Sequence, residues 1–371
     1  MKKEDSWWIN PSVSRSGKLN ADVREILESF ESSLFFHRDQ PEYSPSPLYR
    51  LSGLAKHLGI AELFLKNEGE RYGISAVKML GASYAMHVLY QRNPGIIEFC
   101  TATDGNHGRS VAWTALRLKV RSCIFVPEYT VESRISAMEA EDARVVRVRG
   151  DYDDAVMEAK AYAGKTGAVI VQDMAWEHYE EIPALITAGY YTQMNELMDQ
   201  LPEPVDFLII QSGNGTWPSS VCHFARNHSF FRDKKIILVE PREADCMLES
   251  LICGSLASTR HSLQTLMAGL NCGTPSSLAW KILRKGIDAS IAIGDEYSIE
   301  AMRMLYKPSG DDALVEAGES GAAGLAGLLA ILREPEFENV KKRMGINEQS
   351  KVLLFNTEGI TDPVLFDKLI L

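Results

Sequence analysis

Short apolar runs alternate with stretches of helical periodicity between about residue 95 and residue 201. The runs are IIEFC (96–100), CIFVP (123–127), VVRV (145–148) and AVIVQD (168–173). After each run, apolar residues recur every three or four positions, as Val111, Ala115 and Leu118 do after the first, and this spacing is typical of an amphipathic helix. After the fourth run, the pattern predicts one long helix over 181–201.

The second half of the chain continues the same alternation. Its apolar runs are DFLIIQ (206–211), KIILVE (235–240), ASIAIG (289–294) and KVLLFN (351–356). Strands that alternate with helices predict an α/β fold with mostly parallel sheets covered by helices. In such folds ligands bind where strands end and helices begin, so the loops after these runs are the places to search for a site.

Composition narrows the class of protein. A chain of 371 residues is longer than the roughly 250–300 residues at which single cores stop growing, which predicts two lobes. The formal net charge of -11 disfavours nucleic acid and anionic membranes as partners, because both attract clustered positive charge. Without an apolar run long enough for a signal peptide or a membrane span, we expect a cytoplasmic protein. The six cysteines contain no CxxC pair, so we expect neither a metal site nor a disulfide framework.

The loop QSGNGTWPSS (211–220) has the composition of an anion cradle. Gly213 and Gly215 allow backbone N–H groups to approach a ligand closely, and Thr216 adds a hydroxyl. A helix that begins near Ser219 would direct its positive end at the loop, which suits a phosphate. Taken alone, the loop is equally well explained by a turn that needs two glycines. Nucleotide binding is disfavoured because the GxGxxG and Walker patterns are incomplete.

Two further residues have a chemical and a purely structural interpretation. Lys78 opens a predicted helix, where the helix dipole and partial burial would lower its pKa and suit it to Schiff-base chemistry; most lysines at such positions are simply solvated. Asp104 stands at the tip of the loop TATDGNHGRS (101–110). Its carboxylate can serve chemistry, or it can cap the helix that follows.

Six motifs, which occur in order along the chain, carry a family resemblance that covers roughly residues 35 to 365. They are AVKMLGASYA, TATDGNHGRSVAW, VQDMAWEHYEEIP, MAGLNCGTPSSLAW, AGESGAAGLAGL and NTEGITDP. The set resembles the fold-type II pyridoxal-phosphate enzymes and, within them, the diaminopropionate ammonia-lyases. The resemblance implies two lobes, each with a mostly parallel twisted sheet flanked by helices: a large cofactor-binding domain (1–76 and 183–371) and a small mobile domain (77–182). It also implies a homodimer.

The resemblance assigns roles to individual residues. Lys78 would hold the aldehyde of pyridoxal 5′-phosphate and later move protons at the substrate Cα. Asn106 would bind the ring hydroxyl, and backbone N–H groups near it would receive the substrate carboxylate. Thr357, with Asn356 as the competing candidate, would face the pyridine nitrogen. The expected substrate-carboxylate loop is Gly105, Asn106 and His107; the expected phosphate cradle is Gly213, Asn214, Gly215 and Thr216; and the loop expected near the ring is Glu319, Ser320 and Gly321.

The implied activity is β-elimination of ammonia from 2,3-diaminopropionate, which gives pyruvate and two ammonia. Asp104 replaces a small hydroxyl residue of related dehydratases, so it would pair with the β-ammonium group or act as a second base opposite Lys78. Asp173 is the second candidate carboxylate, unless it only ends a strand. A serine or threonine dehydratase, or a lyase for another β-substituted amino acid, is the alternative. The bulky pair Trp217 and Pro218 beside the cradle also leaves a non-catalytic module open.

Overall fold

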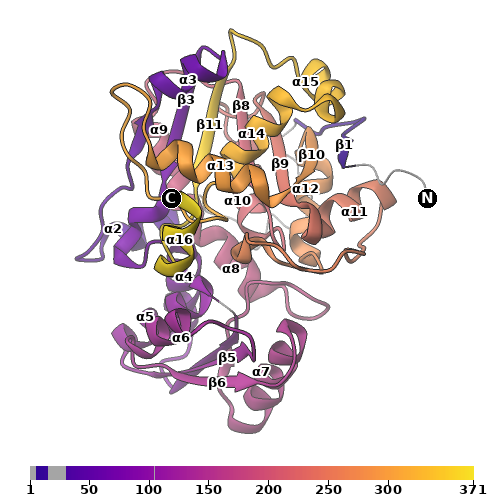
Figure 1. Cartoon of the computed structure of the whole chain (residues 1–371). Coiled ribbons are helices and arrows are strands. Elements are labelled where there is room, and N and C mark those ends of the chain that lie inside the picture. The colour runs from indigo at the N-terminus through magenta and orange to yellow at the C-terminus, as the bar shows by residue number, and fades with distance from the viewer. Residues whose placement is uncertain (1–5, 16–30, 104) are drawn as a thin grey trace.

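The computed structural model describes residues 6–15, 31–103 and 105–371. Figure 1 shows two lobes joined near helices α4 and α8, with the larger lobe at the top and the smaller one, which carries β5, β6 and α7, at the bottom. Asp104, on which the substrate prediction depends most, lies outside the described residues. None of the helices that the structure describes is long and apolar enough to cross a membrane.

A seven-stranded sheet forms the centre of the large lobe, in the order β1-β10-β9-β8-β11-β3-β2. The inner strands are parallel, and the edge strands β1 and β2 pair antiparallel with β10 and β3. The strand bounds are β1 Trp7–Ile9, β2 Leu48–Arg50, β3 Glu62–Asn67, β8 Phe207–Gln211, β9 Lys235–Pro241, β10 Ala289–Ile293 and β11 Lys351–Asn356.

Helices cover both faces of this sheet, which explains why its inner strands are continuous apolar runs. Along β8, Leu208 and Ile210 pack into one core and Phe207 and Ile209 into another, because successive side chains of a strand point to opposite faces. The helices of the large lobe are α2 Ser32–Arg38, α3 Ser52–Leu58, α8 Glu181–Gly189, α9 Tyr191–Gln200, α10 Thr216–Asn227, α11 Cys246–Cys253, α12 Ser277–Gly286, α13 Asp295–Tyr306, α14 Ala323–Arg333, α15 Glu338–Met344 and α16 Pro363–Ile370. Short 3-10 helices are η1 Glu68–Gly73, η2 Arg242–Ala244, η3 Ala268–Leu270 and η4 Pro335–Phe337.

The small lobe contains a four-stranded parallel sheet in the order β6-β5-β4-β7. Its strands are β4 Glu98–Ala102, β5 Arg121–Pro127, β6 Arg144–Val148 and β7 Val169–Ile170. Its helices are α4 Lys78–Arg92, α5 Asn106–Leu118, α6 Glu132–Glu139 and α7 Tyr152–Thr166. The prediction of parallel strands that alternate with helices is therefore confirmed in both sheets.

The prediction of one long helix over 181–201 is wrong. The segment forms two helices, α8 and α9, which meet at Tyr190. At the end of α8, Gly189 packs against α4 so closely that an added Cβ would lie 2.4 Å from the carbonyl oxygen of Leu80. A helical pattern along the sequence does not reveal this contact, because it depends on a helix about a hundred residues earlier.

Candidate active site

One cavity between the lobes brings together the four loops that follow β4, β7, β8 and β11. It encloses about 970 Å³, its open mouth included. The loops contribute lining residues that were singled out in the sequence, and the expectation that the strand-end loops form the site is thereby supported. These residues are Gly105, Asn106, His107, Asp173, Gly213, Asn214, Gly215, Trp217, Pro218 and Thr357. Lys78, at the start of α4, and Ser320, before α14, also line the cavity.

Lys78, the first residue of α4, forms an ion pair with Asp173. The distance from Lys78 Nζ to Asp173 Oδ2 is 2.5 Å. Burial by itself lowers the pKa of Lys78, but the nearby Asp173 carboxylate outweighs it and the net pKa is raised. The expectation of a lowered pKa at this helix start is therefore wrong for the free lysine, because a carboxylate lies in contact with the ammonium group.

Asp173 is a buried carboxylate held at both oxygens. Oδ2 contacts Lys78, and Oδ1 accepts a hydrogen bond from Asn214 Nδ2 at 3.0 Å. Burial raises the pKa of Asp173, but Lys78 and then His107, together with the hydrogen bonds, lower it to about 2. Asp173 thus does more than end a strand: it is an ionised group that faces the predicted cofactor lysine.

The glycine loop after β8 has the shape of a cradle. Gly215 has φ of +92°, and an added Cβ would lie 2.8 Å from Met247 Cε, so only glycine fits without strain. At Gly213 an added Cβ would approach Cys272 Sγ to 3.1 Å. Helix α10 starts at Thr216, and its dipole suits an anion. In its first turn the N–H of Thr216 donates to Asn214 Oδ1 at 3.0 Å and Pro218 has no N–H, so an anion would be bound mainly by backbone N–H groups of the glycine loop.

Two details of this loop differ from expectation. Helix α10 begins at Thr216, three residues before Ser219, so Trp217 and Pro218 lie in its first turn, where proline is tolerated. Thr216 is absent from the described residues that line the cavity: its hydroxyl donates to the carbonyl oxygen of Asp173 at 2.5 Å. Trp217 and Pro218 therefore do not disturb the start of α10, and Trp217 lines the cavity.

Thr357 rather than Asn356 faces the cavity. Gln211 Nε2 donates to Thr357 Oγ1 at 3.0 Å, which leaves the hydroxyl hydrogen of Thr357 available for another acceptor. Asn356 is fully buried and its amide nitrogen donates to Asn67 Oδ1 at 2.7 Å. The competing candidate therefore serves the packing of β11 against β3.

The loop after β4 enters α5 at the mouth of the cavity. Asn106 and His107 are the first residues of α5, where backbone N–H groups have no partner within the helix. The His107 ring is buried, and its Nε2 lies 2.7 Å from the carbonyl oxygen of Val171. Burial lowers the pKa of His107, so the neutral ring fixes the loop. Gly105 N donates to Thr103 Oγ1 at 3.0 Å.

Two charged residues of the site were missed by the sequence analysis. Glu358 lines the cavity directly after Thr357, and Asn106 Nδ2 donates to its Oε2 at 2.6 Å. Arg134, from α6, also lines the cavity and contacts Glu319 at 3.4 Å. Glu358 lay within the quoted motif NTEGITDP, but a single glutamate in a loop has no periodicity that would mark it as buried.

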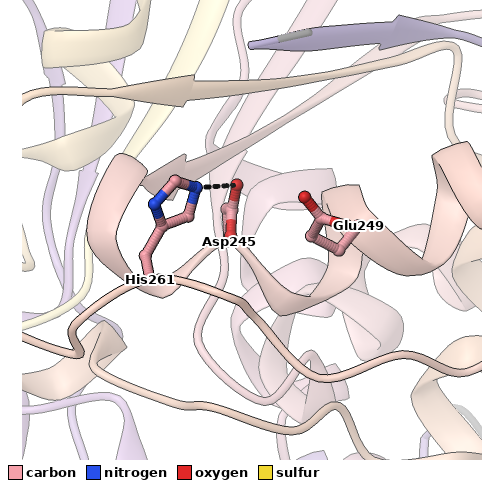
Figure 2. Close-up of side chains that lie close together, drawn as sticks. All are labelled: Asp245, Glu249 and His261. Carbon is pink, nitrogen blue, oxygen red and sulfur yellow. Dashed lines mark ion pairs between the residues drawn. The ribbon is translucent and has the colours of Figure 1, made fainter. Parts of the chain in front are cut away.

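A separate cluster of Asp245, Glu249 and His261 lies in the large lobe (Figure 2). Ligand atoms of the three side chains lie within 4.8 Å of one another, and His261 Nε2 is 3.6 Å from Asp245 Oδ2. Glu249 also faces Arg260 at 3.4 Å, and Asp245 accepts a hydrogen bond from Thr259. Together these contacts form a network of ion pairs and hydrogen bonds beside α11.

Comparison with known proteins places these features in context. Residues 40–344 match the family described as pyridoxal-phosphate dependent enzymes. Diaminopropionate ammonia-lyase of Escherichia coli strain K12 is 34% identical over 365 residues, which span 92% of each chain. The crystal structure of the Escherichia coli enzyme in complex with D-serine aligns with a TM-score of 0.89 at 30% identity, over 98% of this chain and 96% of that one. The complex of that enzyme with an aminoacrylate-PLP azomethine reaction intermediate aligns over the same shares, with a TM-score of 0.87 at 30% identity.

Proposed function

The chain belongs to the pyridoxal-phosphate dependent enzymes, and on this premise we propose that it is a lyase acting on 2,3-diaminopropionate. The reaction removes a proton from Cα and ammonia from Cβ, and water converts the remaining unsaturated amine to pyruvate and a second ammonia. The observation that carries the proposal is the cavity in which Lys78, paired with Asp173, faces the glycine cradle. The similarity to diaminopropionate ammonia-lyase along nearly the whole chain supports the choice of substrate.

The residues present fit the cofactor. At Gly213 an added Cβ would lie 3.1 Å from Cys272 Sγ, which also lines the cavity, and Gly215 has the positive φ that favours glycine. The loop therefore presents backbone rather than side chains, which suits a phosphate at the start of α10. The available hydroxyl hydrogen of Thr357 suits an unprotonated pyridine nitrogen. When bound, pyridoxal 5′-phosphate supplies an electron-withdrawing ring that stabilises negative charge at the substrate Cα.

The side chains of this protein would then divide the proton transfers between them. Lys78 Nζ would hold the cofactor aldehyde in the resting enzyme and, once released as a neutral amine, would take the proton from Cα on its own face. Asp173 would then stabilise the ammonium form of Lys78 that results and would keep negative charge beside the β-amino group. The N–H groups at the start of α5 bind the substrate carboxylate, and Asn106 holds the ring hydroxyl.

Asp104 remains the proposed base for the opposite face of Cα. A carboxylate on that face would let both stereoisomers react and would pair with a β-ammonium group, which serine lacks. A serine or threonine dehydratase follows the same chemistry with a hydroxyl leaving group, so the comparison of substrates decides between the two.

We test the proposal with the purified protein reconstituted with pyridoxal 5′-phosphate. We expect an absorbance band near ~410 nm that borohydride and Lys78→Ala both remove. Pyruvate release should be faster from diaminopropionate than from L-serine. A protein without the band would contradict the cofactor assignment, and faster turnover of serine would favour the dehydratase.

With Asp104→Asn we expect turnover of one diaminopropionate isomer to be lost. If turnover of serine falls equally, this result would argue against pairing of Asp104 with the β-ammonium group.

We also propose that residues 77–182 move as a small domain against the rest of the chain and that the enzyme is a cytoplasmic homodimer. The family resemblance supports the moving domain and the homodimer, and the cytoplasmic location is expected from the lack of a long apolar run in the sequence. Several contacts between the lobes, such as Asp173 with Asn214, surround the cavity, so movement of the small domain would open it and closure would exclude water. The mass of the holoenzyme, measured by sedimentation equilibrium, tests the proposed homodimer.

A further inference from the structure

Glu358 lies at a wall of the cavity where side chains of both lobes meet. It follows β11 in the large lobe, whereas its partner Asn106 is the first residue of α5 in the small lobe. Asn106 Nδ2 donates to Glu358 Oε2 at 2.6 Å, and the backbone N–H of Ser320 donates to Oε1 at 3.3 Å. Only 6% of Glu358 is exposed, so this contact is made away from bulk water.

A carboxylate in this position decides how the Asn106 amide is turned. The nitrogen and oxygen of an asparagine side chain have nearly the same shape, and the surrounding hydrogen bonds fix which one points where. An ionised carboxylate only accepts hydrogen bonds, so it draws the amide nitrogen towards itself. The same nitrogen carries a second hydrogen, which remains to be donated into the cavity.

A second contact between the lobes lies beside the first. Arg134 of α6 in the small lobe contacts Glu319 at 3.4 Å, and Glu319 precedes the Ser320 that binds Glu358. Burial and then the negative charge of Glu319 raise the pKa of Glu358 to about 7, whereas Arg134 lowers it. The other charged groups that face the cavity, Lys78 and Asp173, neutralise each other.

We propose that Glu358 is a positioning residue: across the boundary between the lobes it orients the amide of Asn106 so that an N–H points at the cofactor ring. The proposal rests on the proposed function only through the role of Asn106 at the ring hydroxyl. In this role Glu358 does not need to touch the substrate. Binding of the cofactor ring by Asn106 then depends on contact between the two lobes.

The test uses Glu358→Gln and Glu358→Asp, alone and combined with Asn106→Ala. We expect Glu358→Gln to weaken cofactor binding, measured by equilibrium dialysis without substrate, by about 10- to 150-fold, as for a lost hydrogen bond to a charged group. In the wild type we expect the cofactor absorbance to change in a step near pH 7, where Glu358 titrates, and in Glu358→Gln this change should be absent. Glu358→Asp should retain part of the cofactor binding and part of the absorbance change. In the Asn106→Ala background, Glu358→Gln should change cofactor binding less than about 2-fold, since its partner is gone.

Matched controls separate the loss of the contact between Glu358 and Asn106 from an unspecific effect of removing a carboxylate. Glu177→Gln removes an exposed carboxylate and should leave cofactor binding and the absorbance step unchanged. Glu319→Gln removes the charge that raises the pKa of Glu358, so the absorbance step should move to lower pH. Equal effects of Glu358→Gln with and without Asn106, or an unchanged step, would overturn the inference. If the glutamine variant does not fold, the aspartate variant and the Glu319→Gln shift decide. Failure of the wild type to release pyruvate would instead reject the proposed function, because dialysis and absorbance require no turnover.

Discussion

The sequence identified residues that line the cavity where their position in a strand-end loop marks them, but not where their environment depends on a distant partner. The glycines of the cradle and Asp173 could be identified because they follow apolar runs in loops. The pKa of Lys78 was predicted with the wrong sign, because its partner Asp173 lies 95 residues further along the chain. Glu358 was missed for the same reason: its partners Asn106 and Ser320 lie 252 and 38 residues away along the chain.

The raised pKa of Glu358 predicts how stability depends on pH. The carboxyl keeps its proton in the folded protein up to about pH 7 but releases it near pH ~4.3 in the unfolded chain. The contribution of this carboxyl group to the free energy of unfolding is therefore complete below pH ~4.3 and is lost as the pH rises towards 7. We expect the free energy of unfolding of the cofactor-free wild type to fall between pH 5 and pH 8 by about 1–3 kcal/mol more than that of Glu358→Gln. Urea titrations at the two pH values measure this, and parallel changes in both proteins would contradict it.

At the scale of elements, the alternation of strands and helices from about residue 95 onward followed from the apolar pattern, but the break between α8 and α9 did not. The pattern over 181–201 is helical throughout, whereas in the structure α8 ends at Gly189, which packs closely against α4. That contact matters for the site, since α4 begins with Lys78.

The close approach of α8 to α4 predicts the effect of one methyl group. In Gly189→Ala the added Cβ would meet the carbonyl oxygen of Leu80 at 2.4 Å, and backbone atoms cannot easily move aside. We expect a loss of about 1–3 kcal/mol in the free energy of unfolding and weaker cofactor binding as α4 shifts Lys78. Chemical denaturation and dialysis measure the two effects.

Gly164→Ala is the matched control for this change. Gly164 lies within α7, and an added Cβ there would meet nothing within 4 Å. We expect this variant to gain about 0.5–1 kcal/mol, because alanine favours the helix over glycine. Similar losses for both variants would show that the contact with α4 is not the cause.

At the scale of the whole molecule, the site takes residues from both lobes, and this predicts where the cofactor protects the protein. The start of α5 and Asp173 come from one side, and the cradle and Thr357 from the other. We expect cofactor binding to slow hydrogen exchange in segments 105–115 and 213–225 alike, because a ligand that binds only the folded site stabilises every element that forms it. Mass spectrometry of peptides from the two forms measures this, and protection confined to the large lobe would mean that the small lobe does not take part in holding the cofactor.

The indole of Trp217 gives the protein a built-in optical reporter. Its ring lines the cavity, is only 5% exposed and packs edge-on against Phe355 at 5.4 Å between ring centres. Its emission should therefore be blue-shifted, and an absorbing ring bound in the same cavity should quench it by energy transfer. Loading of the enzyme can then be followed in real time without a dye. Trp217→Phe gives the signal of the other five tryptophans, and its difference from the wild type is the contribution of Trp217.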